Sequence, residues 1–208
     1  MSASVQTLAV RRPLAAGLFL AAAAGLSLPA VAADEYSFDL SHSSIGFAVS
    51  HFGFSQVRGR FAEFDGTLSL DEANIENSSI SVSIATASID TGWADRDDHL
   101  RSGDFFDVEA FPEATFVSTS VTQTGDDTLE VAGDFTLLGT TQPVPLAVTL
   151  NQLGPNPFND EVTIAGFSAS TTISRSDFGM DYGLAIPDDP STGIGDMVTI
   201  VIEAEMQH

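Results

Sequence analysis

Apolar and polar side chains alternate one by one along several segments, and this alternation constrains the fold more than any other feature of the sequence. Clear examples are residues 79–85, 144–151 and 198–205, where every second position is apolar. A period of two places successive side chains on opposite faces of a strand, so each segment predicts a strand with one apolar face. Further strands are expected near 35–40, 44–52, 56–70, 114–124, 128–138 and 162–175.

Turn and helix signals divide these strands. Turns are expected where glycine occurs alone or beside proline, asparagine and aspartate, at Gly66, 125–127, Gly139 and 154–157. Residues 94–102 (ADRDDHLRS) combine dense charge with poor strand composition, and they predict a short helix between strands. Residues 185–196, which are rich in proline, aspartate and glycine, are predicted to form a long exposed loop.

About eight antiparallel strands imply either a sandwich of two sheets or a closed barrel, because both bury alternating apolar positions. Fourteen of the 15 phenylalanines lie in this strand-forming region; only Phe19 lies before it. The alternation by itself leaves open whether they fill a solid core or line a pocket, since an eight-stranded barrel can do either.

The first 33 residues differ in kind from the rest. Two arginines precede an apolar run over 14–28, and small residues follow at 30–33. This order is typical of a cleaved secretory signal, and a run of this length is short of the roughly 20 residues of a membrane span. An uncleaved N-terminal anchor is the alternative. We therefore expect a signal peptide over 1–33, a mature domain over 34–208 without an integral membrane span, and a periplasmic or secreted location.

The charge balance excludes several classes of function. All 29 acidic residues but only 7 − 2 = 5 arginines fall in 34–208, which gives this part a net charge of 5 − 29 = −24. A polyanion would be repelled, so nucleic acid is not expected as a partner. The chain also lacks cysteine, which rules out disulfides, thiolate zinc sites and a cysteine nucleophile.

Two basic residues stand on otherwise apolar strand faces. His51 follows on the face formed by Ile45, Phe47 and Val49. Arg175 follows on the face formed by Phe167, Ala169, Thr171 and Ile173. A buried arginine has to be paired, because an isolated charge in an apolar interior is very costly. Its partner is either Asp177 or another acid of the protein, which the surplus of acids favours, or the polar head of a ligand.

The histidines offer a weak case for a metal site. His42, His51 and His99, with Asp39, Asp97 or Asp98, could in principle bind zinc, but no two of them show a close ligand spacing. Hydrogen-bonded structural histidines are therefore favoured, and neither a metal nor a cofactor is expected. Motifs of serine hydrolases, phosphate loops and zinc proteases are absent from the sequence, so no catalytic residue is assigned.

Several runs of residues, taken together, point to a known family. In chain order they are FDLSHS at 38–43 with Phe47 and His51, TGWADRDDHLRS at 91–102, DFFDV at 104–108, FPEATFVS at 111–118, GDFTLLGTTQPV at 133–144 and SRSDFG at 174–179. They resemble the YceI family of periplasmic, lipocalin-like polyisoprenoid-binding proteins, and the resemblance covers nearly all of 35–206.

The resemblance implies an all-β fold, namely an elongated eight-stranded antiparallel lipocalin-like barrel with the short helix packed near one end. It also implies an apolar tunnel that holds a long isoprenoid or fatty-acid-like chain. Such a chain makes no hydrogen bonds along its length, so it needs a dry apolar lining with a few polar groups at one end. The predicted ligand-binding residues are Phe47, His51, Phe116, Phe135, Phe167, His99 and Arg175.

The sequence therefore favours a binding or carrier protein for a long-chain amphiphile rather than an enzyme. Two alternatives remain open. One is an enzyme that uses a cluster of His, Asp and Arg side chains, and the other is a solid-core barrel with a structural or stress role. A homodimer is also left open, because dimers occur among similar proteins.

Overall fold

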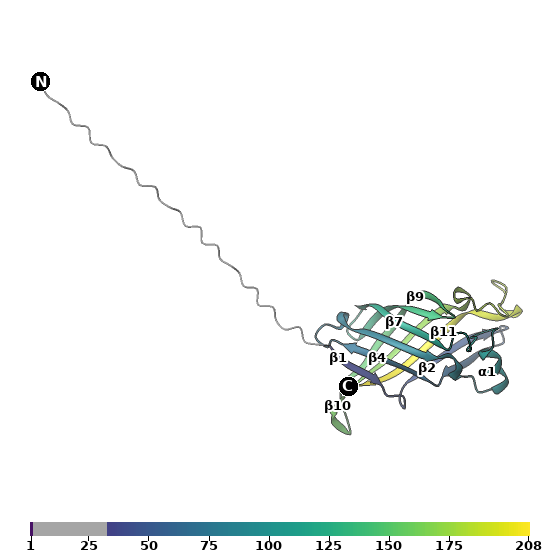
Figure 1. Ribbon diagram of the computed structural model, residues 1–208, viewed down its shortest axis with the longest axis horizontal. Coiled ribbons are helices and arrows are strands. Elements are labelled where there is room, and N and C mark those ends of the chain that lie inside the picture. Colours follow the sequence, from purple (N-terminus) through teal and green to yellow (C-terminus); the bar gives the residue numbers. More distant parts are fainter. Residues whose placement is uncertain (2–32) are drawn as a thin grey trace. The chain divides into compact units, whose positions relative to one another are not determined.

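The strands expected from the alternation are present in the computed structural model, which describes residues 33–208 together with Met1 (Figure 1). The predicted signal peptide thus lies almost entirely outside the described residues. The strands are β1 (Asp34–Phe38), β2 (Ser44–His51), β3 (Ser55–Phe61), β4 (Phe64–Leu70), β5 (Ser79–Ala85), β6 (Ile89–Asp90), β7 (Glu113–Gln123), β8 (Thr128–Leu137), β9 (Thr140–Asn156), β10 (Asn159–Ser174) and β11 (Ile194–Gln207). The helix is α1 (Ala94–Arg101), with short 3-10 turns at Ile75–Asn77, Thr86–Ser88, Arg175–Phe178 and Pro190–Thr192.

Within residues 33–208 the eleven strands form a closed barrel of only eight rows, because each of the first three rows is divided into two strands. β11 pairs with β2 along most of its length and with β1 at its end, so β1 and β2 make up one row. In the same way β4 pairs with β1 while β3 pairs with β2, and β5 pairs with β4 while β6 pairs with β3. All ladders are antiparallel, which confirms the predicted eight-stranded barrel with a helix near 94–102.

The interruptions and turns correct three details of the sequence prediction. The strand expected over 56–70 breaks at Ala62 and Glu63. Gly66 lies inside β4 rather than in a turn, and glycine is needed there because a side chain would collide with the ring of Phe38 and the backbone of β5. The run 154–157 mostly belongs to β9, which lacks a β8 partner beyond Thr149 and therefore tolerates proline along that free edge.

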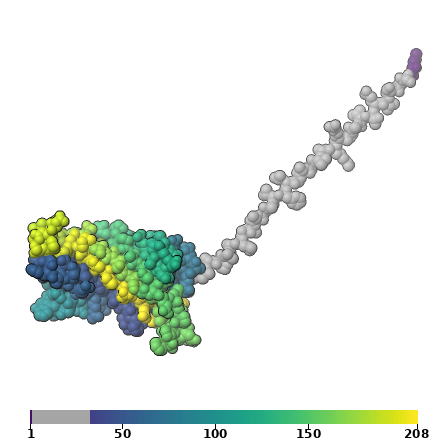
Figure 2. Space-filling model, turned by 180° about the vertical axis from the view of Figure 1, so that it is seen from behind, coloured from purple at the N-terminus to yellow at the C-terminus, as the bar shows by residue number. Residues whose placement is uncertain are grey.

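The connection before β11 begins and ends earlier than the loop predicted over 185–196. β11 already begins at Ile194, and a 3-10 turn occupies Pro190–Thr192. This β10–β11 connection, residues 175–193, lies beside the tip of the β2–β3 hairpin, where the amide of Phe52 donates to the carbonyl oxygen of Gly193 at 2.9 Å. Figure 2 shows the connection in yellow next to the hairpin in dark blue.

The two ends of the barrel differ. Figure 1 places α1 and the β10–β11 connection at one end, and β1 with the C-terminus at the other. The end near β1 contains a buried apolar cluster that includes Tyr36, Leu70 and Met206. None of the helices among residues 33–208 is long and apolar enough to cross a membrane.

Candidate functional site

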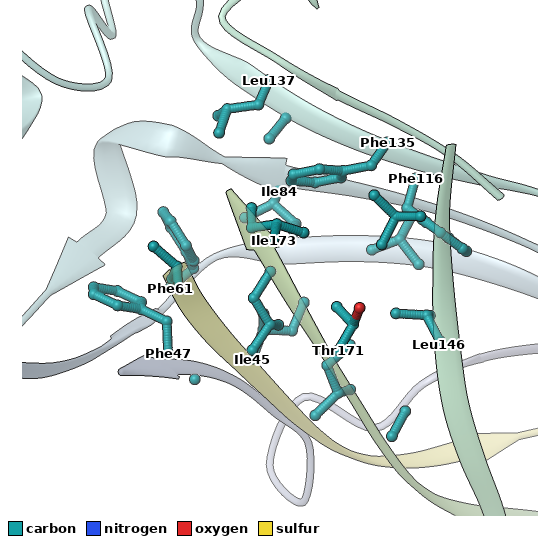
Figure 3. A pocket seen from close by; sticks show the side chains of 18 of the residues that line it. Ile45, Phe47, Phe61, Ile84, Phe116, Phe135, Leu137, Leu146, Thr171 and Ile173 are labelled. Carbon is teal, nitrogen blue, oxygen red and sulfur yellow. The ribbon is translucent and has the colours of Figure 1, made fainter. Parts of the chain in front are cut away.

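A cavity of about 380 Å³ runs through the interior of the barrel. Its wall is built from the inward-facing alternate residues of nearly every strand, and Figure 3 shows such side chains from β2, β7, β8 and β10 converging on one space. The volume falls within the roughly 300–1,000 Å³ typical of small-molecule pockets. The interior is therefore a lumen with apolar walls, which does not fit the alternative of a solid core.

Glycines on neighbouring strands make room for two of the lumen phenylalanines. Phe47 is paired with Gly59 across the β2–β3 ladder, and a Cβ atom at Gly59 would overlap the Phe47 ring. Gly133 on β8 is paired with Ser118 rather than with Phe116, but a Cβ atom at Gly133 would likewise overlap the Phe116 ring. The two rings therefore occupy space that a side chain at either glycine would take.

The structure places every predicted ligand-binding residue in the wall of this lumen. Phe116 is buried, and three other phenylalanines are half-buried. Arg175 is only 3% exposed, whereas the two histidines are exposed at the rim. The role of all seven residues in ligand binding stays a prediction. The residues are Phe47, His51, Phe116, Phe135, Phe167, His99 and Arg175.

Aromatic rings gather at the α1 end of the lumen. The imidazole of His99 lies edge-on to the rings of Phe105 and Tyr182, with ring centroids 5.0 and 5.1 Å apart. Phe105 and Tyr182 are themselves 5.2 Å apart, so the three rings form one cluster. The Nε2 atom of His99 lies 2.9 Å from a carboxylate oxygen of Asp104, which orients the imidazole at the rim.

Arg175 is paired within the protein, but not with an acid. Its Nη1 donates to the carbonyl oxygens of Met180 and Tyr182, at 2.7 and 3.0 Å. Its Nε donates to the carbonyl oxygen of Gly195 at 3.0 Å, and Nη2 to that of Ile194 at 3.4 Å. The expectation of Asp177 or another acid as partner is wrong. The guanidinium instead turns back into the β10–β11 connection, where main-chain oxygens surround it.

Nearby carboxylates act on Arg175 only at longer range. Burial lowers the pKa of the Arg175 guanidinium, and the charges of Asp196 and Asp181 partly offset this effect. Burial would by itself raise the pKa of the Asp196 carboxyl, but hydrogen bonds from Ser174 and Ser176 hold that pKa below its usual value. Arg175 therefore stays charged, and Asp196 accepts hydrogen bonds from Ser174 and Ser176 rather than from Arg175.

Arg96 is a lumen residue that the sequence analysis missed. Its Nε donates to Thr91 Oγ1 and its Nη2 to the main-chain oxygen of Thr91, both at 2.7 Å. Arg96 precedes His99 by three positions on α1, so both residues lie on one side of the helix, and both line the lumen. Applied to the predicted helix, the three-residue spacing would have identified Arg96 beside His99.

The histidines considered for a zinc site are not brought together. Among residues 33–208, one group of potential metal ligands lies close enough to share an ion, and it contains Asp39, His42 and Glu205 but neither His51 nor His99. His42 Nδ1 lies 2.8 Å from a carboxylate oxygen of Asp39 and 3.8 Å from one of Glu205. Hydrogen bonds from Ser41 and His42 lower the pKa of Asp39 to about 2. This group does not line the lumen.

The sequence and the fold are similar to those of known proteins. The family described as YceI-like domain matches residues 36–206. A UPF0312 protein of Pseudomonas putida strain F1 is 45% identical over 157 residues, which are 74% of this chain and 81% of that protein. Among solved structures, BcnA of Burkholderia cenocepacia superposes with a TM-score of 0.69 at 26% identity and covers 82% of this chain and 99% of its own.

A more distant structure is a polyisoprenoid binding domain from Saccharophagus degradans, described as implicated in plant cell wall breakdown. It superposes with a TM-score of 0.59 at 17% identity over 82% of this chain and 97% of its own. At this identity the likeness shows a shared barrel fold and nothing more specific.

Proposed function

This chain belongs to the YceI-like family, and we propose that it is a binding or carrier protein that holds a long-chain amphiphile in its lumen. The proposed ligand is a polyisoprenoid or a fatty-acid-like lipid. The single observation that carries this proposal is the apolar cavity of about 380 Å³ inside a closed barrel. An alkyl or isoprenoid chain gains about 25 cal/mol for each Å² of apolar surface removed from water, so such a lumen suits it.

The comparison with the Saccharophagus degradans domain supports the same ligand class. That protein is described as polyisoprenoid binding, and its barrel superposes on this one over most of both chains. The shared fold offers this chain the same kind of interior, while the residues that line the interior are its own.

We propose binding rather than catalysis because the polar groups near the lumen are engaged with the protein. Arg175 donates to main-chain oxygens, His99 pairs with Asp104, and Asp97 accepts from Thr91. A catalytic reading requires such groups to converge on one reacting atom. An enzyme that uses this His, Asp and Arg set is the alternative, and it predicts turnover of a bound lipid.

We also propose that the mature protein acts in the periplasm or outside the cell. The arginines, apolar run and small residues of the first 33 positions support this location. Sequencing the N-terminus of exported protein tests it, and the expected start is Ala33 or Asp34. Exported protein that begins within residues 1–30 would contradict cleavage at this site.

Native mass spectrometry of protein purified from a cell extract tests the carrier proposal. We expect a co-purifying species of lipid mass that organic extraction removes. A stoichiometric metal, together with a bound lipid that has lost a substituent, would support the enzyme instead. The proposal would be overturned if the purified protein carries no lipid and if no added amphiphile displaces a fluorescent fatty acid from it.

A further inference from the structure

The charged side chains of the lumen are all of one sign. The mature part of the chain has 29 acids and five arginines, yet none of the lumen-lining residues, all of which fall within 33–208, is aspartate or glutamate. Four lining residues are instead cationic or can become so: Arg96, Arg175, His51 and His99. In a chain this acidic, such a wall contrasts sharply with the remainder of the molecule.

Three of these four residues are linked by a series of contacts at the α1 end. His51 is the ladder partner of Ile194, whose carbonyl oxygen accepts from Arg175. Arg175 also donates to the carbonyl oxygen of Tyr182, and the Tyr182 ring lies against His99. The same end carries Arg96 on α1. The opposite end of the lumen is lined by apolar side chains such as Leu70 and Met206.

Neither arginine forms an ion pair within 4 Å in the described part of the chain, and the charges of Asp196 and Asp181 act on Arg175 only at longer range. The arginine ion pairs within 4 Å among residues 33–208 are Arg60 with Asp90 and Arg101 with Asp98. Arg175 is 3% exposed and its hydrogen bonds all go to uncharged carbonyl groups. Arg96 uses its Nε and Nη2 atoms on Thr91, and its Nη1 donates no hydrogen bond within residues 33–208.

We infer that the amphiphile carries an anionic head group, a carboxylate or a phosphate, which lies at the α1 end of the lumen beside Arg96 and Arg175. This inference rests on the proposed function, because it assigns the chemistry of one end of the same ligand. A buried guanidinium without a counter-ion is costly, and an anionic head supplies the missing charge with strong, short hydrogen bonds. The apolar chain then extends toward Leu70 and Met206.

A neutral or cationic head fits this end less well. An alcohol or amide head would leave both guanidinium groups without a direct counter-ion next to an apolar chain, and an amine would add a third positive charge. The surplus of acids on the outer surface does not reverse this preference, since exposed charges are screened over about 8–10 Å in salt whereas lumen charges are screened much less.

The test compares four amphiphiles with one chain length: palmitate, hexadecyl phosphate, hexadecanol and hexadecylamine. Each displaces a neutral naphthylamine dye from the delipidated mature protein. We expect at least one of the two anions to bind about tenfold more tightly than hexadecanol, which corresponds to a hydrogen bond to a charged group. The tighter of the two anions identifies the head as carboxylate or phosphate.

Substitutions then locate the effect. Arg96→Gln should weaken binding of the preferred anion about tenfold and leave hexadecanol unchanged. Arg58→Gln is the matched control, because Arg58 is an exposed arginine of β3 that does not line the lumen. If Arg175→Gln folds, the same loss of affinity for the anion is expected in it. If it does not fold, Arg96→Gln alone tests the assigned site.

Each outcome bears on one claim. Hexadecanol that binds as tightly as both anions overturns the anionic head but leaves the carrier proposal standing. An equal loss in Arg58→Gln and Arg96→Gln would mean a general charge effect, and it would overturn the assigned site. Failure of every amphiphile to displace the dye overturns the carrier proposal itself.

Discussion

The guanidinium of Arg175 donates a 2.7 Å hydrogen bond to the main-chain oxygen of Met180, five residues further along the chain. The same side chain reaches Tyr182 and, across to β11, Gly195. Arg175 thus fastens the β10–β11 connection to the barrel while it lines the lumen. A structural role and the proposed contact with the ligand head therefore meet in one residue, and the two have to be separated by experiment.

Loss of the hydrogen bonds that Arg175 donates should destabilise the fold. Arg175→Gln leaves buried main-chain oxygens without donors, and we expect the free energy of unfolding to fall by about 2–4 kcal/mol. Urea denaturation followed by circular dichroism measures the loss. Arg58→Gln, at an exposed position, should change it by less than about 0.5 kcal/mol. If the two variants prove equally stable, the fastening role is wrong.

A bulkier ring in the lumen should block the ligand rather than unfold the barrel. Phe167 is half-buried and borders the cavity, so Phe167→Trp has free volume to occupy. We expect the variant to bind a fluorescent fatty acid more weakly than wild type, with an almost unchanged melting temperature. Phe116→Trp is the comparison: its ring lies against Gly133, and overpacking there costs about 1–3 kcal/mol. Equal destabilisation by both variants would indicate a filled core.

The close packing of the Phe116 ring against Gly133 gives a separate prediction. In Gly133→Ala the new methyl group would overlap that ring and push it into the lumen. We expect a loss of about 1–3 kcal/mol in the free energy of unfolding, together with reduced lipid binding. Gly154→Ala in β9 is the matched control, since a Cβ atom there meets nothing within 4 Å. A Gly133→Ala protein that melts and binds like wild type would show that the ring can move without cost.

The pair of Asp39 and His42 should make stability depend on pH. The hydrogen bond to Asp39, the charge of Asp39 and the charge of Glu205 raise the pKa of His42 above its ordinary value of 6.5. Protons are therefore bound more tightly in the folded state. The stabilisation is fully present below pH 6.5 and is lost as the pH rises through the folded-state pKa.

Titration of the His42 ring by NMR tests this assignment. Asp39→Asn should lower the pKa of His42, because it removes both the charge and the main hydrogen bond. Glu205→Gln should lower it less, since that carboxylate is 3.8 Å away. If Asp39→Asn has no effect on the titration, the contact does not persist in solution.

Removal of metal ions should leave the protein unchanged. Dialysis against a chelator is expected to leave the melting temperature where it was, because the fold rests on the barrel ladders and its buried side chains. The group of Asp39, His42 and Glu205 is the place to examine if this fails. A large drop that zinc restores, and that His42→Ala abolishes, would contradict the prediction.

The alternation of side chains was sufficient to predict much of this architecture. A period of two decides which residues of a strand face inward, so Phe47, Phe116, Phe135 and Phe167 could be placed in the interior before the fold was known. The helix near 94–102 followed equally well from its composition. Row interruptions such as the break at Ala62 and Glu63 could not be predicted, because they depend on which strands pair and where the pairing ends.

The sequence by itself determined that the chain would form strands with one apolar face each, since that property is carried by neighbouring residues along each strand; the alternation alone fitted a sandwich as well as a barrel. Only the tertiary structure decided that these faces enclose a cavity, and that its ionisable end is cationic and free of acids. It also decided that Arg175 turns to the carbonyl oxygens of Met180, Tyr182 and Gly195 instead of Asp177. Hydrogen-bond partners of this kind come from separate segments whose approach depends on closure of the whole barrel, and no local pattern encodes that approach.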